Sequence, residues 1–526
     1  MSANPSQTTE PQAVPEETLG GMIYLPPPPA RGFDDVGDGW NVETDVVVVG
    51  TGPGGAAAGH ALAEAGHRVV FLEEGPPQNR FASHYADAMR FHMQEAGGMV
   101  ATGSALVGVA AGRGVGGGTL VNSAICWRAP DAILDTWGEQ LDAEHLNAKS
   151  IGKRYTELET LLGVAETPDG IAGENNRLIV RGVKALGYEG GFMRRNTPGC
   201  IGAGVCYFGC PVLGKNGVNH NLLPRAVGAG ARIQADTKVV DVIVENNRAV
   251  GVRGYTYHPE TRALGGEVVV RAKHVVLSAG AVGTPRLLHT CGLADRMGPV
   301  GEGLHVHPGS AVLGICDHDV LMWKGATQGA YYHPPDLPGV LPHTFSASPD
   351  VCLTALAGAG WRGKSGFEML PKLCGLIVMV SDKGQGRVGA HSDGRAKISY
   401  RFDDDDVGRI KNGMVDAAKV LLAGGAKQVF APVHNTGVAD SADALATMLE
   451  PAHIRDFMLY AAHPMSTCRM GTDPNTSVVD ANGESHAVEG LSIADASVFP
   501  TSLGVNPQLT VMALANQIGR GLAQRL

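Results

Sequence analysis

The first residues that could do chemistry are a cluster of glycines followed by an acid. Gly50, Gly52 and Gly55 lie in the run Gly-Thr-Gly-Pro-Gly-Gly, and Glu73 ends the next apolar segment. Such glycines permit a tight turn, let the backbone approach a pyrophosphate and allow close helix–strand packing, while the helix N-terminus faces the anion. The acid can accept hydrogen bonds from both ribose hydroxyls and argues against a 2′-phosphate. The pattern predicts a dinucleotide site for NAD or FAD.

The elements that must position these residues surround them in the sequence. Asp45–Val49 is a continuously apolar strand, Gly54–Gly66 is an Ala-rich helix and Arg68–Glu73 is a second strand. A strand, turn, helix and strand of this compactness form a right-handed βαβ unit in a parallel sheet. The turn residues expected at the phosphates are Gly50, Gly52, Pro53, Gly54 and Gly55.

Further strands and helices are predicted later in the chain, before and after a region of different composition. Between about residues 305 and 455 the chain changes to Pro-rich loops and short aromatic-bearing strands. The first 40 residues are rich in Pro, Glu, Ser and Thr, which is typical of an extended arm. The clearest further elements are strands at Val239–Val244, Arg248–Val252, His274–Ser278, Gly375–Val380 and Leu491–Ala494, and helices at Asp405–Leu422 and from about Pro507.

The composition argues against a nucleic-acid partner and against a transmembrane span. The 526 residues hold 52 acidic and 42 basic side chains, for a net charge of −10. A nucleic-acid binder needs a clustered Lys and Arg surface, and no such cluster is present. Two charge-free stretches, Val46–Ala63 and Ala496–Gly519, are interrupted by glycine or proline, so we expect no transmembrane span. No export signal is visible, and we expect a cytoplasmic location.

The nine cysteines do not predict a disulfide framework in a chain of this size. Cys200, Cys206 and Cys210 cluster in one Gly-rich segment, but their spacing matches neither a zinc ribbon nor the usual iron–sulfur run. We interpret the segment as a structural turn and predict no metal. His305 and His307 form a His-x-His pair without a third ligand and are likewise given no metal role.

Four longer segments, taken in order, resemble the signatures of one enzyme family, the glucose–methanol–choline (GMC) oxidoreductases. They are Gly112–Pro130, Gly280–Leu293, His463–Gly471 and Gly490–Ala515. The family consists of FAD-dependent alcohol oxidases and dehydrogenases. The loop from Gly112 and the tail from Gly490 are most similar to the cholesterol-oxidase and long-chain alcohol-oxidase branches.

The resemblance implies an α/β fold, with a Rossmann-type FAD-binding domain and an inserted α+β substrate domain built on an antiparallel sheet. The expected divisions are an extended arm (1–40), FAD-binding parts (41–155, 215–304 and 456–526), a linking and cap segment (156–214) and a substrate-binding domain (305–455).

The resemblance also implies a catalytic pair. His463 matches the catalytic histidine, and a neutral imidazole can accept the hydroxyl proton while hydride leaves the carbinol carbon for flavin N5. Asn506 matches the second position, where it can hydrogen-bond the same substrate oxygen and orient it. Val121 stands where some relatives carry a histidine bonded to the flavin, so we expect non-covalent FAD.

The remaining FAD-binding residues implied by the resemblance lie in the loop after Gly112, in an adenine-contacting strand, and at three later turns. They are Arg113, Gly116, Gly117, Gly118, Thr119, Asn122, Ser123, Val239 or Val240, Ala279, Gly280, Asp495, Ala496, Asn506, Pro507 and Gln508.

The expected function is oxidation of an alcohol to a carbonyl, on a bulky apolar or aromatic alcohol, with O2 or another electron acceptor. A lyase or decarboxylase on the same flavin scaffold, or a flavoprotein without turnover, are the alternatives. The sequence leaves open the actual substrate, the electron acceptor, the oligomeric state and the role of the three clustered cysteines.

Overall fold

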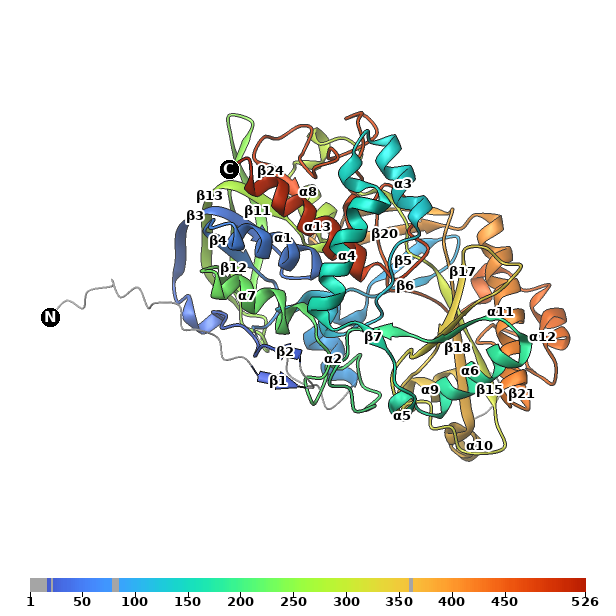
Figure 1. Ribbon diagram of the computed structural model, residues 1–526. Coiled ribbons are helices and arrows are strands. Elements are labelled where there is room, and N and C mark those ends of the chain that lie inside the picture. The colour runs from blue at the N-terminus through green and yellow to red at the C-terminus, as the bar shows by residue number, and fades with distance from the viewer. Residues whose placement is uncertain (1–16, 20–21, 78–84, 359–362) are drawn as a thin grey trace.

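The computed structural model describes residues 17–19, 22–77, 85–358 and 363–526 (Figure 1). Residues 1–16 and 20–21 of the predicted N-terminal arm therefore lie outside the described residues. What is described of it is the antiparallel pair β1 (Glu17–Leu19) and β2 (Met22–Tyr24), then a segment with one 3-10 turn (Phe33–Asp35) before β3 begins at Gly39.

The first sheet contains the predicted βαβ unit. β3 (Gly39–Val49), α1 (Pro53–Glu64) and β4 (Val69–Leu72) follow one another, and β3 and β4 are parallel. Val46, Val47 and Val48 are fully buried because both faces of a parallel sheet are covered. The other strands are β10 (Arg232–Gln234), β11 (Thr237–Glu245), β12 (Arg248–Tyr257), β13 (Leu264–Leu277) and β24 (Leu491–Ile493).

The strand order of this sheet brings distant segments together. The order is β10-β4-β3-β13-β12-β11, and β24 pairs in parallel with the end of β13. The C-terminal ends of β3, β13 and β24 consequently lie side by side, and each continues into a turn that carries predicted site residues.

Helices cover this sheet closely. α1 packs against α13 (Gln508–Ala523), with α7 (Leu222–Gly228) and α4 (Ala148–Leu162) beside them (Figure 1). The α1–α13 crossing needs a glycine, because a Cβ at Gly519 would lie 2.5 Å from the carbonyl oxygen of Ala58. α8 (Gly280–Thr290) follows β13, and α3 (Asp131–Gln140) precedes α4.

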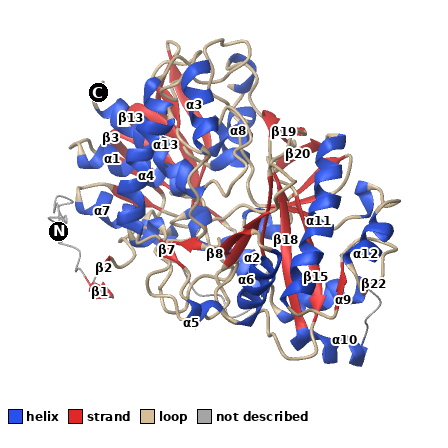
Figure 2. Ribbon diagram, turned by 45° about the vertical axis from the view of Figure 1, so that its right-hand side comes forward, coloured by secondary structure: helices blue, strands red, loops and turns tan. Residues whose placement is uncertain are grey.

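The second sheet occupies the other half of the molecule (Figure 2). It was expected to be antiparallel, but it is mixed, because β20 pairs in parallel with β5 and β23 pairs in parallel with β6. Its main path is β14 (Glu302–Leu304), β19 (Gln385–Ala390), β20 (Ala396–Arg401), β5 (Val100–Gly103), β6 (Val107–Val109), β23 (Leu459–Ala461), β15 (Gly309–Ile315), β18 (Leu373–Val380), β17 (Val340–Thr344), β16 (Ala330–His333) and β8 (Glu189–Phe192), with β21 (Gln428–Phe430) and β22 (Val438–Ala439) at one side.

Five strands of this sheet lie outside the expected substrate-domain range of 305–455. They are β5, β6, β8, β14 and β23. Short strands from distant segments complete the sheet by pairing with the longer strands of the inserted region, which a local sequence pattern cannot show.

Two helices cover the second sheet. α11 (Asp404–Gly424) crosses α6 (Glu174–Leu186) so closely that a Cβ at Gly182 would lie 2.0 Å from the carbonyl oxygen of Val420. α12 (Ala442–Leu449) packs on α11, while α9 (Pro349–Gly358) and α10 (Gly363–Met369) lie at one end. Each sheet thus has its own hydrophobic core.

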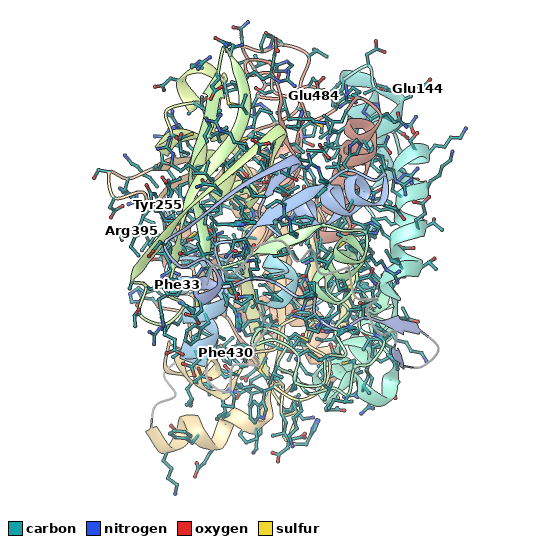
Figure 3. All side chains as sticks on the ribbon, turned by 90° about the vertical axis from the view of Figure 1, so that its left-hand side faces the viewer. Phe33, Glu144, Tyr255, Arg395, Phe430 and Glu484 are labelled. Atoms are coloured by element: carbon teal, nitrogen blue, oxygen red, sulfur yellow. The ribbon has the colours of Figure 1, made fainter. Side chains whose placement is uncertain are left out.

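Most charged side chains lie at the surface of the described residues, and most large apolar side chains lie in the core. In Figure 3, Glu144 and Arg395 lie at the outline of the molecule, whereas Phe430, on β21 of the second sheet, is fully buried. Among the described residues, no helix has the length and apolar composition needed to cross a bilayer.

Candidate active site

The glycine turn after β3 packs against neighbouring backbone at three positions. Gly50 has φ +103°, and a Cβ there would lie 2.3 Å from the carbonyl oxygen of Ser278 at the end of β13. A Cβ at Gly54 would lie 2.1 Å from the carbonyl oxygen of Ala494, and one at Gly55 would lie 2.0 Å from that of Gly50. These glycines hold the start of α1 against the ends of β13 and β24.

A second glycine loop lies directly against this turn. A Cβ at Gly117 would be 2.6 Å from the Cα of Gly52, which caps α1 ahead of Pro53. Gly116 has φ +117°, and Thr119 closes the loop by donating to the Gly116 carbonyl oxygen at 2.7 Å.

This second loop and the turn after β13 each have an open side. A Cβ at Gly118 or at Gly280 would meet no atom within 4 Å. The first N–H groups of α1 have no acceptor within the helix, as at any helix N-terminus. Glycine backbone beside open space and a helix N-terminus is an arrangement that accommodates a pyrophosphate.

The carboxylate of Glu73 accepts hydrogen bonds from the loops around it. Its Oε2 accepts from the N–H and the hydroxyl of Thr51 at 3.1 and 2.6 Å, and its Oε1 accepts from the N–H groups of Gly75 and Gly114 at 2.9 and 3.1 Å. Glu73 thus clamps three loops together, and its expected role toward the ribose stays a prediction. The sequence could not show that Thr51 and Gly114 converge on this acid.

Other polar groups near Glu73 remain available. Oδ1 of Asp236 and Nε of Arg113 are buried without a hydrogen-bond partner. Asp236 donates its N–H to the Gly75 carbonyl oxygen, and burial raises the pKa of its carboxyl to about 6. Neither Asp236 nor the neighbouring acid Glu74, which pairs with Arg286 at 3.2 Å, was expected from the sequence. Their position after the ends of β10 and β4 was the only signal.

The predicted adenine-contacting residues lie on the edge strand β11. Val239 pairs with Gly254 of β12, and a bulge follows, so that Val240 has no Cα partner in the ladder. Both valines are half-buried. Thr237, at the start of β11, donates its N–H to the carbonyl oxygen of Glu73, which brings this strand to the same loops.

Asp495 connects two turns through its side chain. Its Oδ2 accepts from the N–H of Gly280 at 2.8 Å and from the Thr284 hydroxyl at 2.6 Å, and its Oδ1 caps the next turn at Ser497. Burial raises the pKa of this carboxyl. Ala279 caps α8, and the Ala496 carbonyl oxygen accepts from the N–H of Ser466. Asp495 thus fixes the backbone rather than offering free oxygens.

Asn122 and Gln508 hold the loop against the start of α13. Asn122 donates to Oε1 of Gln508 at 2.6 Å, and Gln508 donates to the Ile125 carbonyl oxygen at 3.0 Å. Pro507 caps α13, so the first N–H groups of that helix have no acceptor within it. Ser123 contributes its carbonyl oxygen as an acceptor for Nε of Arg195.

The predicted catalytic pair lies between these loops and the second sheet. His463 follows β23, Asn506 precedes the cap of α13, and Nε2 of His463 lies 3.1 Å from Nδ2 of Asn506. Burial, with His307 and His343 nearby, holds the pKa of His463 well below its usual range. The ring is therefore neutral at ordinary pH, as a proton acceptor must be.

His307 contacts the pair and was not assigned to the site from the sequence. Gly504 donates its N–H to Nε2 of His307 at 2.9 Å, and Nδ1 of His307 lies 3.4 Å from Nδ1 of His463. Burial lowers the pKa of His307 to about 4, so its single proton is on Nδ1 and is donated to His463.

This chain of hydrogen bonds decides where the protons of the pair reside. Because Nδ1 of His463 accepts, its own proton is on Nε2, facing Asn506. Oδ1 of Asn506 is buried without a partner, and exchanging the amide oxygen and nitrogen lets Nε2 of His463 donate to the amide oxygen. In this arrangement His463 is a donor at Nε2.

A buried acid, Asp382, contacts the segments that carry the histidines. Asp382 accepts from the N–H of Val306 at 2.9 Å and from the Ser502 hydroxyl at 2.9 Å, and lies 3.6 Å from Nδ1 of His305. Burial alone would raise the pKa of Asp382, but the contact with His305 and the charges of both histidines lower it to about 2. Among the described residues no three His, Cys, Asp or Glu side chains gather as a metal site.

Comparisons with known proteins agree on one family. Two family models, both described as GMC oxidoreductase, match residues 89–309 and 383–515. An uncharacterised GMC-type oxidoreductase of Mycobacterium tuberculosis is 34% identical over 475 residues, covering 90% of this chain and 74% of that protein.

More distant relatives have named activities. A long-chain-alcohol oxidase of Arabidopsis thaliana is 28% identical, covering 93% of this chain and 67% of its own. A cholesterol oxidase of Acinetobacter baumannii is 25% identical, covering 91% and 94%. The crystal structure of a pyridoxine 4-oxidase shares the fold, with a TM-score of 0.68 at 17% identity over 91% of this chain and 99% of that one.

Proposed function

The chain belongs to the GMC oxidoreductase family, and from that premise we propose that it oxidises an alcohol to a carbonyl compound with FAD. The observation that carries the proposal is the contact between His463 and Asn506 at 3.1 Å, beside the glycine loops. Relatives named as alcohol oxidases support this reaction class.

The residues of the site fit FAD. Gly118 and Gly280 present backbone to open space, and α1 begins at the same place. Arg113 and Asp236 offer unpartnered polar atoms toward the nucleotide end of the site. When bound, FAD supplies the two-electron acceptor for the reaction. Val121 has no nucleophilic side chain, so we propose that FAD is held without a covalent bond at this position.

His463 and Asn506 act on the alcohol oxygen. Asn506 orients that oxygen, and His463 accepts the hydroxyl proton. To accept it, His463 must have Nε2 free and its own proton on Nδ1, facing His307. His307 can accept that proton only if its own moves to Nε2, where Gly504 now donates. The proposal therefore requires the Gly504–His307 hydrogen bond to break when the alcohol binds.

The substrate we propose is a bulky apolar or aromatic alcohol, and the electron acceptor is O2 or another oxidant. The named relatives support the substrate class, since they act on a long-chain alcohol and on cholesterol. The test is an anaerobic screen in which steroid, long-chain, benzylic and sugar alcohols are mixed with the purified flavoprotein. Bleaching of the oxidised flavin band by an apolar alcohol, and none by a sugar, is the expected result.

A His463→Ala variant tests the catalytic pair. We expect flavin reduction by the best alcohol to slow several hundredfold, about 4 kcal/mol in the barrier, with FAD still bound. The matched control is His391→Ala, on an exposed turn. Equal rates in the wild type and His463→Ala would remove His463 from the mechanism. If no alcohol reduces the flavin, the lyase, decarboxylase and non-catalytic alternatives take its place.

A further inference from the structure

Two buried cations behind the loop at residues 120–123 lack a carboxylate partner. Arg195 is 1% exposed and Lys215 is 4% exposed. Among the described residues, neither forms an ion pair with an Asp or a Glu, and the charges that act on Lys215 are those of Cys206, Cys210 and Arg195. A buried cation is strongly disfavoured unless an anion compensates it.

The contacts of the two cations converge on Cys206. Arg195 donates from Nη2 to the Cys206 sulfur at 3.3 Å and from Nε to the Ser123 carbonyl oxygen at 2.8 Å, while its Nη1 is buried without a partner. Lys215 donates from Nζ to the carbonyl oxygens of Leu120, Asn122 and Cys206 at 2.7, 2.9 and 3.0 Å. Carbonyl oxygens are dipoles and do not neutralise a full charge, so the Cys206 sulfur is the group in contact that can carry one.

Cys206 differs from the other titratable groups around it because its sulfur contacts one of the two cations, Arg195. Tyr207 is the next residue, and burial raises the pKa of its hydroxyl to about 12. Cys200 and Cys210 line the same small pocket as Lys215 and Cys206, which is itself only half-buried. Burial lowers the pKa of Lys215 to about 8, so the lysine keeps its charge at neutral pH.

We propose that Cys206 is a thiolate, held as the counter-ion of Arg195 and Lys215, and that it is the reactive cysteine of this chain. Burial alone would raise the pKa of its thiol, but the charges of Arg195 and Lys215 lower it below the ordinary value. The half-buried Cys291 serves as the comparison, because burial raises the pKa of its thiol above the ordinary value. Elsewhere, burial raises the pKa of Cys126 and of Cys352 to about 12, and the lowered pKa of the buried Cys316 comes first from its hydrogen bond with Cys374, not from a cation.

The ligand class of this site is a small electrophile, with a peroxide as the biological example. The Cys206 sulfur attacks one oxygen of hydrogen peroxide, a sulfur–oxygen bond forms, and the oxygen–oxygen bond breaks with hydroxide leaving. The sulfur is oxidised to a sulfenic acid and the peroxide is reduced. The product no longer carries the thiolate charge, so oxidation leaves Arg195 and Lys215 without their counter-ion.

The test is alkylation of the intact flavoprotein with iodoacetamide between pH 5.5 and 9.5, with each cysteine quantified by mass spectrometry. We expect Cys206 to react at least tenfold faster than Cys291 at pH 7, and the midpoint of its pH profile to lie below that of an ordinary thiol. Brief treatment with hydrogen peroxide and a sulfenic-acid trap should label Cys206 first. The measurement needs no turnover, so its outcome is independent of whether the protein oxidises alcohols.

Variants separate the charge effect from access. Lys215→Met and Arg195→Gln should each move the midpoint of the Cys206 profile upward, and the milder Arg195→Lys, which keeps the cation, should not. If the buried variants do not fold, the wild-type profile alone decides. A Cys206 midpoint at or above that of Cys291 overturns the proposal. Protection of Cys206 that a chelator removes also overturns it, since the thiolate would then belong to a metal.

Discussion

At the scale of single residues, the chain of hydrogen bonds through His463 decides which atoms can do chemistry. A backbone N–H cannot become an acceptor, so Gly504 fixes the tautomer of His307, and His307 in turn fixes that of His463. This assignment of protons makes His463 a donor at Nε2, whereas the proposed reaction needs an acceptor there.

The tautomer change gives a direct prediction. In protein labelled with 15N at the histidine rings, the oxidised enzyme should show Nε2 of His463 protonated and Nδ1 unprotonated. Adding an unreactive analogue of the best alcohol should reverse the two signals, because the proton then has to lie on Nδ1. His463→Gln identifies the signals. An unchanged spectrum with the analogue bound would contradict the proposed role of His463 as the base.

The second prediction at the scale of single residues concerns Glu73. Its two oxygens accept four hydrogen bonds, so a Glu73→Gln variant would place an NH2 group against two donors. Each buried donor left unpaired costs about 1–3 kcal/mol, and we expect a loss of this order in the free energy of unfolding of the apoprotein. Urea denaturation measures it. The control is Glu64→Gln on α1, and an equal effect of both changes would argue against the clamp.

At the scale of elements, neighbouring glycines of the second loop have different tasks although they look alike in sequence. Gly117 packs on Gly52 with φ +53°, whereas a methyl group added to Gly118 would meet no atom within 4 Å. The first glycine is needed for the contact between protein segments, and the second is free to approach a ligand.

A pair of variants separates these tasks. Gly117→Ala should lower the stability of the apoprotein by about 1–3 kcal/mol, because the methyl group meets backbone at 2.6 Å in a strained conformation. Gly118→Ala should leave apoprotein stability nearly unchanged and weaken FAD binding at least tenfold, measured by fluorescence titration. Unchanged FAD affinity in Gly118→Ala would mean that the open side does not face the cofactor.

At the scale of the whole molecule, buried neutral histidines in both halves of the fold make the free energy of unfolding depend on pH. His220 and His274 lie around the first sheet, and His307 and His343 lie on or beside the second. Burial lowers the pKa of each of the four to about 4. In the unfolded chain each returns to about 6.5, so between pH 6.5 and 4 the unfolded state binds more protons.

Stability should therefore fall as pH drops through that window. Each such histidine contributes up to about 3 kcal/mol of loss by pH 4. Asp236 acts in the opposite direction, since its raised pKa of about 6 makes the folded state bind a proton first. Urea unfolding at pH 7.5, 6.0 and 5.0 measures the sum. In His274→Gln the decrease should be smaller, and a wild-type stability independent of pH in this range would contradict the assignment.

The sequence alone determined the family and the βαβ unit, and it singled out His463 and Asn506, which the structure brings into contact, because these depend on local signals. Glycines at fixed spacing after an apolar strand, and a histidine within a recognisable segment, can be identified without any knowledge of the partners they meet. The predicted strands before Gly50 and at Gly375–Val380 agree with β3 and β18 for the same reason: apolar periodicity is a local property.

Only the tertiary structure decided which polar atoms are free and which are used. Glu73 meets Thr51 and Gly114, His463 meets His307, and Arg195 meets Cys206, contacts that no local pattern in the chain reveals. The mixed second sheet likewise combines strands from distant segments. Hydrogen bonds and ion pairs act over a few ångströms, so their partners are fixed only once packing of the two sheets brings these segments together.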